Sequence, residues 1–415
     1  MPIRKILITV LLALAPAIAL ADVVTTTGDK PKIADSTGRI IYQPQTTKPT
    51  PTPQPSGPPT PLTRVSPSDT LVAIQAKLNT VPVGGALVFS QGTYAFGGTL
   101  RGKSGVTLWA DGVVIITGPG VGTAGAFDFS GLSSWTVRGR KPGDGFVFQG
   151  TLINATSANG TPAKPWAVGN SVFRDVANNG FDGSAIRMSG ASFGLVINND
   201  FVNAGGNVLG MYSWDNITVE GNTFTNVGQI ASVHNNENGD ASRGRNIKFL
   251  RNVGIGIQRA AVEIGPGGRQ NFTEIAIEEN WFDQFGDTGL NDGGSRLGIS
   301  CVGMQASNTV IKNNFLRIGN LPSSVGKVGV AIEIAGTGEV TGNTIINFAY
   351  PVLTYRSGWN VHDNVVYNDG IFPYVGFVNN GQNQDFGTGT FGPEIIIRAP
   401  SAAPAVPPKP SRIVW

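Results

Sequence analysis

Cysteine and histidine are nearly absent from this chain of 415 residues, which contains one cysteine, Cys301, and two histidines, His234 and His362. One cysteine excludes an intramolecular disulfide and any metal cluster built on cysteines. Two histidines exclude a metal site built from several imidazoles. We therefore predict no metal site and no cofactor, and only a calcium requirement stays open.

Charged residues are scarce as well: they make up 14% of the chain, against roughly 25% in an average globular protein. The net charge is +3, and no run of basic residues follows Arg4 and Lys5, so nucleic acid is not a predicted partner. The chain is instead rich in glycine (57) and asparagine (33), with no asparagine before Asn79. This composition excludes coiled coils and helical bundles and is typical of many short strands joined by turns.

The first 21 residues have the pattern of a secretory signal peptide. Arg4 and Lys5 precede an apolar run over residues 6–20, which ends in the small-residue motif Ala19-Leu20-Ala21. The run is shorter than the roughly 20 residues that a membrane span needs. We therefore expect a secreted protein (extracellular, periplasmic or on the cell surface) that has no membrane contact after cleavage.

Two proline-rich segments bound the predicted folded domain. Seven prolines lie between Pro49 and Pro61, and five lie between Pro400 and Pro410, which is typical of extended spacers. We predict a linker over 22–63, a domain over 64–399 and a C-terminal tail over 400–415. The domain opens with Ser68-Asp69-Thr70 ahead of Leu71, Ile74 and Leu78, which predicts one capped amphipathic helix.

An internal repeat follows the predicted helix. Its unit is an apolar residue, two variable residues, asparagine, one variable residue and a second apolar residue. The asparagines of the eight copies are Asn170, Asn199, Asn222, Asn252, Asn280, Asn313, Asn343 and Asn364. A constant unit with insertions of variable length is typical of stacked coils. Equivalent asparagines would lie about 4.8 Å apart and hydrogen-bond one another as a ladder.

A second short strand precedes most of the repeat units. Coils of two or three strands behind a capping helix predict an all-β fold, a right-handed parallel β-helix. The motifs Gly92-Thr93-Tyr94, Gly98-Thr99-Leu100 and the stretch 103–108 resemble the opening of the pectin-lyase-like β-helix superfamily. This resemblance implies a polysaccharide partner, but the fold hosts hydrolases, lyases, epimerases and adhesins alike.

Catalytic signatures of that superfamily are mostly missing. The chain lacks the Asn-Thr-Asp, Asp-Asp and Gly-His-Gly set of polygalacturonases, the Asp-Pro-His of mannuronan epimerases and the Arg-x-Pro-x-x-Arg of pectate lyases. The residues of the candidate site must therefore be chosen by the expected geometry of the strands.

Side-chain alternation in the second strands predicts one polar outer face. The side chains expected to point inward include Ile186, Leu209, Val262, Val302, Met304, Ile332, Leu353 and Tyr355. Those expected to point outward are Arg187, Tyr212, His234, Glu263, Gln305, Glu333 and Arg356. A strip that mixes acids, bases and an aromatic side chain suits a linear polymer better than a small molecule.

Glu263 and Glu333 are the predicted catalytic pair. They occupy equivalent positions with one coil between them, where we place Gly303, so their backbones should lie about 9.6 Å apart. Inverting glycosidases hold their two carboxyls about 6.5–9.5 Å apart around a water molecule. The first hypothesis is therefore a glycoside hydrolase. The alternative is that both carboxylates are surface groups paired with Arg259 or Arg356.

Two other functions stay open. Residues 165–400 contain eleven arginines but three lysines, and arginine binds carboxylates bidentately, which favours an acidic glycan. A polysaccharide lyase could use His234 as its base, with Arg187 and Arg259 neutralising a uronate. We assign substrate binding to Arg187, Tyr212, Arg259, Gln305 and Arg356. The third hypothesis is a non-catalytic glycan-binding protein of the cell surface or matrix.

Tryptophans and the cysteine complete the candidates. Trp214, Trp281 and Trp359 could stack on sugar rings or pack in the core. Cys301 is expected to be buried and inert.

Overall fold

The computed structural model describes residues 57–120, 122–141, 143–176, 184–210, 212–233, 244–265, 272–285, 297–301, 307–318, 329–346, 348, 350–354 and 359–368, together with four short strands outside these ranges. Two of the four, β1 (Ile33–Ala34) and β2 (Ile40–Tyr42), pair with each other in antiparallel fashion. The other two are β32 (Val378–Asn379) and β33 (Ile395–Arg398).

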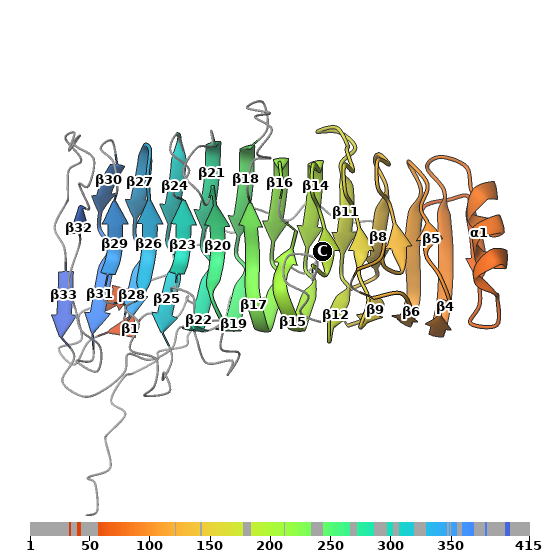
Figure 1. Ribbon diagram of the computed structural model, residues 1–415, viewed down its shortest axis with the longest axis horizontal. Coiled ribbons are helices and arrows are strands. Elements are labelled where there is room, and N and C mark those ends of the chain that lie inside the picture. Colours follow the sequence, from red (N-terminus) through yellow and green to blue (C-terminus); the bar gives the residue numbers. More distant parts are fainter. Residues whose placement is uncertain are drawn as a thin grey trace, which may run out of the picture.

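The remaining strands form coils in which each strand pairs in parallel with its counterpart one coil away, giving three stacks along one long axis (Figure 1). The first stack contains β3 (Leu62–Val65), the starts of β4 (Ala86–Ala95) and β6 (Thr107–Thr117), β8 (Thr136–Gly139), β11 (Trp166–Gly169), β14 (Ser192–Ile197), β16 (Asp215–Glu220), β18 (Arg245–Leu250), β21 (Thr273–Glu278), β24 (Thr309–Lys312), β27 (Gly338–Thr341) and β30 (Trp359–His362).

The second stack continues β4 and β6. It contains β9 (Phe146–Gln149), β12 (Val172–Arg174), the starts of β15 (Asp200–Leu209) and β17 (Thr223–Val233), β19 (Val253–Ile257), β22 (Trp281–Phe285), β25 (Phe315–Ile318), β28 (Thr344–Ile346), β31 (Val365–Asn368) and β33.

The third stack closes each coil. It contains β5 (Leu100–Arg101), β7 (Phe127–Asp128), β10 (Ile153–Asn154), β13 (Ile186–Arg187), the ends of β15 and β17, β20 (Ala260–Ile264), β23 (Leu297–Cys301), β26 (Val330–Ile334), β29 (Tyr350–Thr354) and β32. The all-β parallel helix predicted from the repeat is therefore confirmed.

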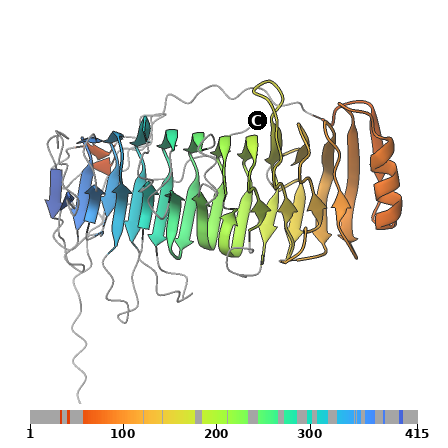
Figure 2. The ribbon, with the colours of Figure 1, turned by 45° about the horizontal axis from the view of Figure 1, so that its top comes forward.

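Helix α1 (Leu71–Thr80) closes the N-terminal end of the coils, as predicted (Figure 2). Thr70 is its N-cap, because the Thr70 side chain accepts a hydrogen bond from the Ala73 amide. Ile74 and Leu78 are buried against the first coils, whereas Val72 is exposed. No helix among the described residues is long and apolar enough to cross a bilayer.

Stacked aromatic side chains fill the core beside the second stack. Phe148, Phe173, Phe201 and Phe224 lie in successive coils, with ring centroids 4.7, 5.1 and 4.9 Å apart. Gly254 occupies the next position of this column and interrupts it. A Cβ there would lie 2.6 Å from Cδ1 of Ile257, so the neighbouring aliphatic side chains already fill the gap.

An asparagine ladder lies at the corner between the first and second stacks. In each coil the side-chain oxygen accepts bonds from the backbone amide and the side-chain Nδ2 of the preceding asparagine; between Asn222 and Asn199 these bonds are 2.9 and 3.1 Å. The ladder residues are Asn199, Asn222, Asn252, Asn280, Asn314, Asn343 and Asn364. Six of the eight predicted members are confirmed.

The predictions for Asn313 and Asn170 were wrong by one residue. Asn314 is the ladder residue, and Ser171 holds the equivalent place where its amide bonds the Asn199 oxygen. Asn313 and Asn170 instead have φ of +53° to +54°, the left-handed conformation that asparagine tolerates better than most residues. Each is the turn residue just before the ladder position, and one step along a strand reverses the face.

The register of the third stack also differs from the one predicted from the sequence. Ser300 lies opposite both Glu263 and Glu333, so Gly303 was the wrong residue for the intervening coil. Gly303, Val302 and Met304 lie outside the described residues. Leu353 pairs opposite Glu333 and Val352 opposite the core residue Ile332, so Leu353 points outward, contrary to the prediction.

Candidate functional site

The outer face of the third stack carries a column of four polar residues, one in each of four successive coils. They are Ser232 on β17, Glu263 on β20, Ser300 on β23 and Glu333 on β26. Their chain neighbours Val262, Ile264, Ile299 and Cys301 belong to the core, so alternation turns the polar side chains outward. We call these four residues the outer column.

Glu263 is buried although it faces outward, with 4% of its surface exposed. Its Oε2 accepts hydrogen bonds from Ser232 Oγ (2.8 Å) and Gln229 Nε2 (3.0 Å), and Arg259 Nη2 lies 3.3 Å from Oε1. These partners are all donors, so both carboxylate oxygens of Glu263 have hydrogen-bond partners although the side chain is buried.

Glu333 is half-buried two coils away, and its Oε2 accepts a 3.0 Å bond from Ser300 Oγ. Two steps of about 4.8 Å place the two glutamate backbones about 9.6 Å apart. On the same strand as Ser300, Cys301 points into the core, where burial, and secondarily the charge of Glu333, raises the pKa of its thiol to about 12. The expectation of a buried, inert thiol agrees with this.

The other candidates are spread along the same face. Arg187 lies three coils before Glu263, about 14 Å along the axis, and donates to the carbonyl of Thr123 (3.1 Å). Tyr212 is 39% exposed. Among the predicted binding residues that the structure describes, Arg259 contacts Glu263. His234, Gln305 and Arg356 lie outside the described residues, and their assignments stay predictions.

Sequence reasoning missed three residues around the glutamates: Gln229, Ser232 and Ser300. Ser300 could have been found, because Ile299-Ser300-Cys301 repeats the apolar–polar–apolar pattern of the triplets centred on Glu263 and Glu333. Gln229 lies where β17 bends from the second stack to the third, and no local pattern marks it.

Solved structures with the same coil arrangement were found by structural comparison. A tailspike mutant of E. coli bacteriophage HK620, in complex with a hexasaccharide, aligns at 14% identity and a TM-score of 0.51, over 81% of this chain and 62% of the tailspike chain. The chain therefore spans less than two thirds of the tailspike's length. The chain folds as a right-handed parallel β-helix.

Two further solved structures align less closely. The polygalacturonase of Erwinia carotovora ssp. carotovora has 14% identity and a TM-score of 0.47, over 83% of this chain and 95% of its own. The surface protein and adhesin PfbA of Streptococcus pneumoniae has 12% identity and a TM-score of 0.45, over 81% of this chain and all of its own. No model of a known protein family matches the chain, and no curated protein does.

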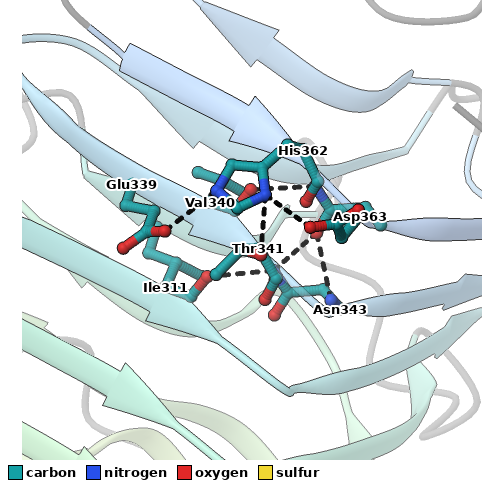
Figure 3. A network of polar contacts seen from close by, with 8 residues as sticks. Ile311, Glu339, Val340, Thr341, Asn343, His362 and Asp363 are labelled. Carbon is teal, nitrogen blue, oxygen red and sulfur yellow. Dashed lines mark hydrogen bonds and ion pairs between the residues drawn. The ribbon is translucent and has the colours of Figure 1, made fainter. Parts of the chain in front are cut away.

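A second polar cluster lies on the outer face of the first stack, near the C-terminal end of the β-helix (Figure 3). His362 Nε2 lies 2.9 Å from Glu339 Oε1, and Nδ1 lies 2.7 Å from Asp363 Oδ2 and 3.3 Å from Thr341 Oγ1. The carboxylate of Asp363, and then that of Glu339, raises the pKa of His362. Two carboxylates on one ring favour the doubly protonated imidazolium.

The three candidate tryptophans are buried: Trp214, Trp281 and Trp359 are 0, 5 and 3% exposed. Trp214 and Trp359 belong to the core inside the coils. Trp281 lies on the opposite face of its strand from the core residue Phe282 and packs in a separate apolar cluster with Val253, Phe315 and Ile346. Within the described ranges, no group of three or more His, Cys, Asp or Glu side chains could hold a metal ion.

Proposed function

We propose that the protein binds a linear polysaccharide along the outer face of the third stack and hydrolyses it with Glu263 and Glu333. The observation that carries this proposal is the outer column, in which the two carboxylates share one register position with a single coil between them. The backbone separation of about 9.6 Å is close to the roughly 6.5–9.5 Å that separates the two carboxyl groups of inverting hydrolases.

The contacts of the two glutamates suggest their roles. Glu263, which is surrounded by donors, is the base that takes a proton from water as the water oxygen attacks the anomeric carbon. Glu333, which is more exposed, is the acid that gives its proton to the departing glycosidic oxygen. The C–O bond breaks, and no other reactant is required.

The polymer is proposed to be acidic. Arg187 and Arg259 lie along the same face, and guanidinium groups bind carboxylates bidentately. Tyr212, Gln305, Arg356 and His234 keep their predicted binding or catalytic roles in this proposal. The hexasaccharide bound by the HK620 tailspike supports the ligand class, because it is an extended sugar chain on a β-helix protein.

Secretion is part of the proposal. Cleavage after Ala21 would release the chain from its signal peptide, and expression with residues 1–21 intact should yield an exported protein whose N-terminus is Asp22. Intact-mass measurement of the exported fraction checks this.

Incubation with a panel of neutral and acidic glycans tests the activity. New reducing ends without ultraviolet absorbance support hydrolysis, whereas absorbance of an unsaturated uronate would instead establish the lyase. Glu263→Gln and Glu333→Gln should each abolish turnover while leaving glycan binding intact, because glutamine keeps the shape but cannot transfer the proton.

A non-catalytic binder is the second candidate function. The observation in its favour is that Glu263 is buried and contacted by three donors, as a purely structural carboxylate would be. Glycan binding without either product, unchanged in both glutamine variants, would establish it.

A further inference from the structure

Ser300 occupies the position between the two glutamates of the outer column. It lies opposite Glu263 on one side and opposite Glu333 on the other, so about 4.8 Å of backbone separates it from each. It is completely buried. Any side chain at this position helps to define the space between the two carboxylates.

The hydroxyl of Ser300 has a specific partner: its Oγ donates to Glu333 Oε2 at 3.0 Å. The same contact occurs two coils earlier, where Ser232 Oγ donates to Glu263 Oε2 at 2.8 Å. In both cases a serine donates to the glutamate of the following coil. A donor to a carboxylate fixes the orientation of that carboxylate.

Serine combines two properties at this position. Its side chain is short enough to pack completely buried between the coils of the two glutamates, and its hydroxyl can restrain Glu333. Alanine keeps the small size without the hydrogen bond. Threonine keeps the hydrogen bond and adds one methyl group.

We propose that Ser300 is a positioning residue for the reaction: its hydroxyl orients the Glu333 carboxyl. This inference rests on the proposed function. It assigns Ser300 a role separate from substrate contact, since Ser300 acts through Glu333.

Kinetics of full-length Ser300→Ala and Ser300→Thr test the role, on the most active glycan of the panel. Ser300→Ala should lower kcat about tenfold or more, the worth of a hydrogen bond to a charged group, with KM nearly unchanged. Ser300→Thr should restore the rate.

Cys301→Ala is the matched control, because it truncates a buried side chain of similar size on the same strand but facing the core. It should leave kcat unchanged, even if stability falls. The inference is wrong if Ser300→Ala keeps the wild-type kcat while Glu333→Gln is inactive. If both glutamine variants stay active, the proposed function itself fails.

Discussion

Two columns of polar residues run along the axis of this β-helix, and they are built on different rules. The ladder at the corner between the first and second stacks repeats one residue, asparagine, in seven coils. The outer column of the third stack alternates instead, as Ser232, Glu263, Ser300 and Glu333.

The difference follows from the chemistry of the side chains. An amide carries donors and an acceptor, so identical residues can bond one another in every coil. A carboxylate only accepts when it is ionised, and two of them in adjacent coils would repel. A hydroxyl between carboxylates removes that conflict. A repeated asparagine thus stabilises the stacked coils from within, whereas alternating serine and glutamate allows acidic side chains to line up on the outer face.

The largest effect is expected in the ladder. Asn314→Ala removes the acceptor of the Asn280 amide and Nδ2 and the donor to the Ile277 carbonyl, leaving buried polar groups unpaired. We expect the free energy of unfolding to fall by about 3–5 kcal/mol, measured by denaturant titration. Asn313→Gly is the neighbouring control. It should change stability by less than about 1 kcal/mol, since glycine readily adopts a positive φ. A larger loss from the control would contradict the revised register.

The next effect concerns the charge around Glu263. Arg259→Ala leaves a buried carboxylate without its cation, and we expect a loss of about 2 kcal/mol in unfolding free energy. The double variant Arg259→Ala/Glu263→Gln should recover much of that loss, because the remaining group is neutral. No recovery would mean that Arg259 acts through packing alone.

A substitution that breaks the serine–glutamate alternation of the outer column should lower the free energy of unfolding by a smaller amount. Ser300→Asp places three carboxylates in adjacent coils, and we expect a loss of about 1–2 kcal/mol at pH 8 relative to Ser300→Asn. The difference between these two variants should shrink as pH falls and the acids become protonated. Thermal unfolding of both variants at pH 4 and pH 8 measures it, and a pH-independent difference would argue against repulsion.

The smallest effect is expected at His362, outside both columns. Its raised pKa means that it stabilises the fold fully below its ordinary value of 6.5, and that this contribution is lost as pH rises through the folded-state pKa. The charged groups facing it are Glu339 and Asp363, and Lys312 lies two coils away in the same column. The ring is partly exposed, so solvent screening limits the effect to less than about 1 kcal/mol. His362→Gln should flatten the pH dependence of unfolding between pH 6 and 8.

The sequence predicted the coil architecture because one ladder residue recurs in a fixed local pattern. The prediction was wrong where asparagine suits two adjacent positions. In the doublet Asn313-Asn314 either residue fits the turn, and only the hydrogen bond to the next coil identifies Asn314 as the ladder residue. One residue after Asn170, the ladder position is occupied by Ser171 rather than by an asparagine.

The candidate site was harder to predict, because loop lengths differ between coils. From Ile264 to the ladder Asn280 the chain takes 16 residues, but from Ile334 to Asn343 it takes 9. Counting back from the ladder therefore cannot place Ser300, and only the triplet Ile299-Ser300-Cys301 marks it locally. Gln229 depends on a bend in β17 that no sequence pattern marks.

The glycine that interrupts the phenylalanine column has a consequence for how the molecule comes apart. Each coil of a solenoid is held by its neighbours alone, so cooperativity passes along the axis through side chains stacked from coil to coil. At Gly254 the stacking of ring on ring stops, and aliphatic side chains fill the place of a ring. We expect the rod to unravel in two stages under heat or mechanical load, with the coils beyond Gly254 opening first and the segment sealed by α1 persisting as a shorter folded rod.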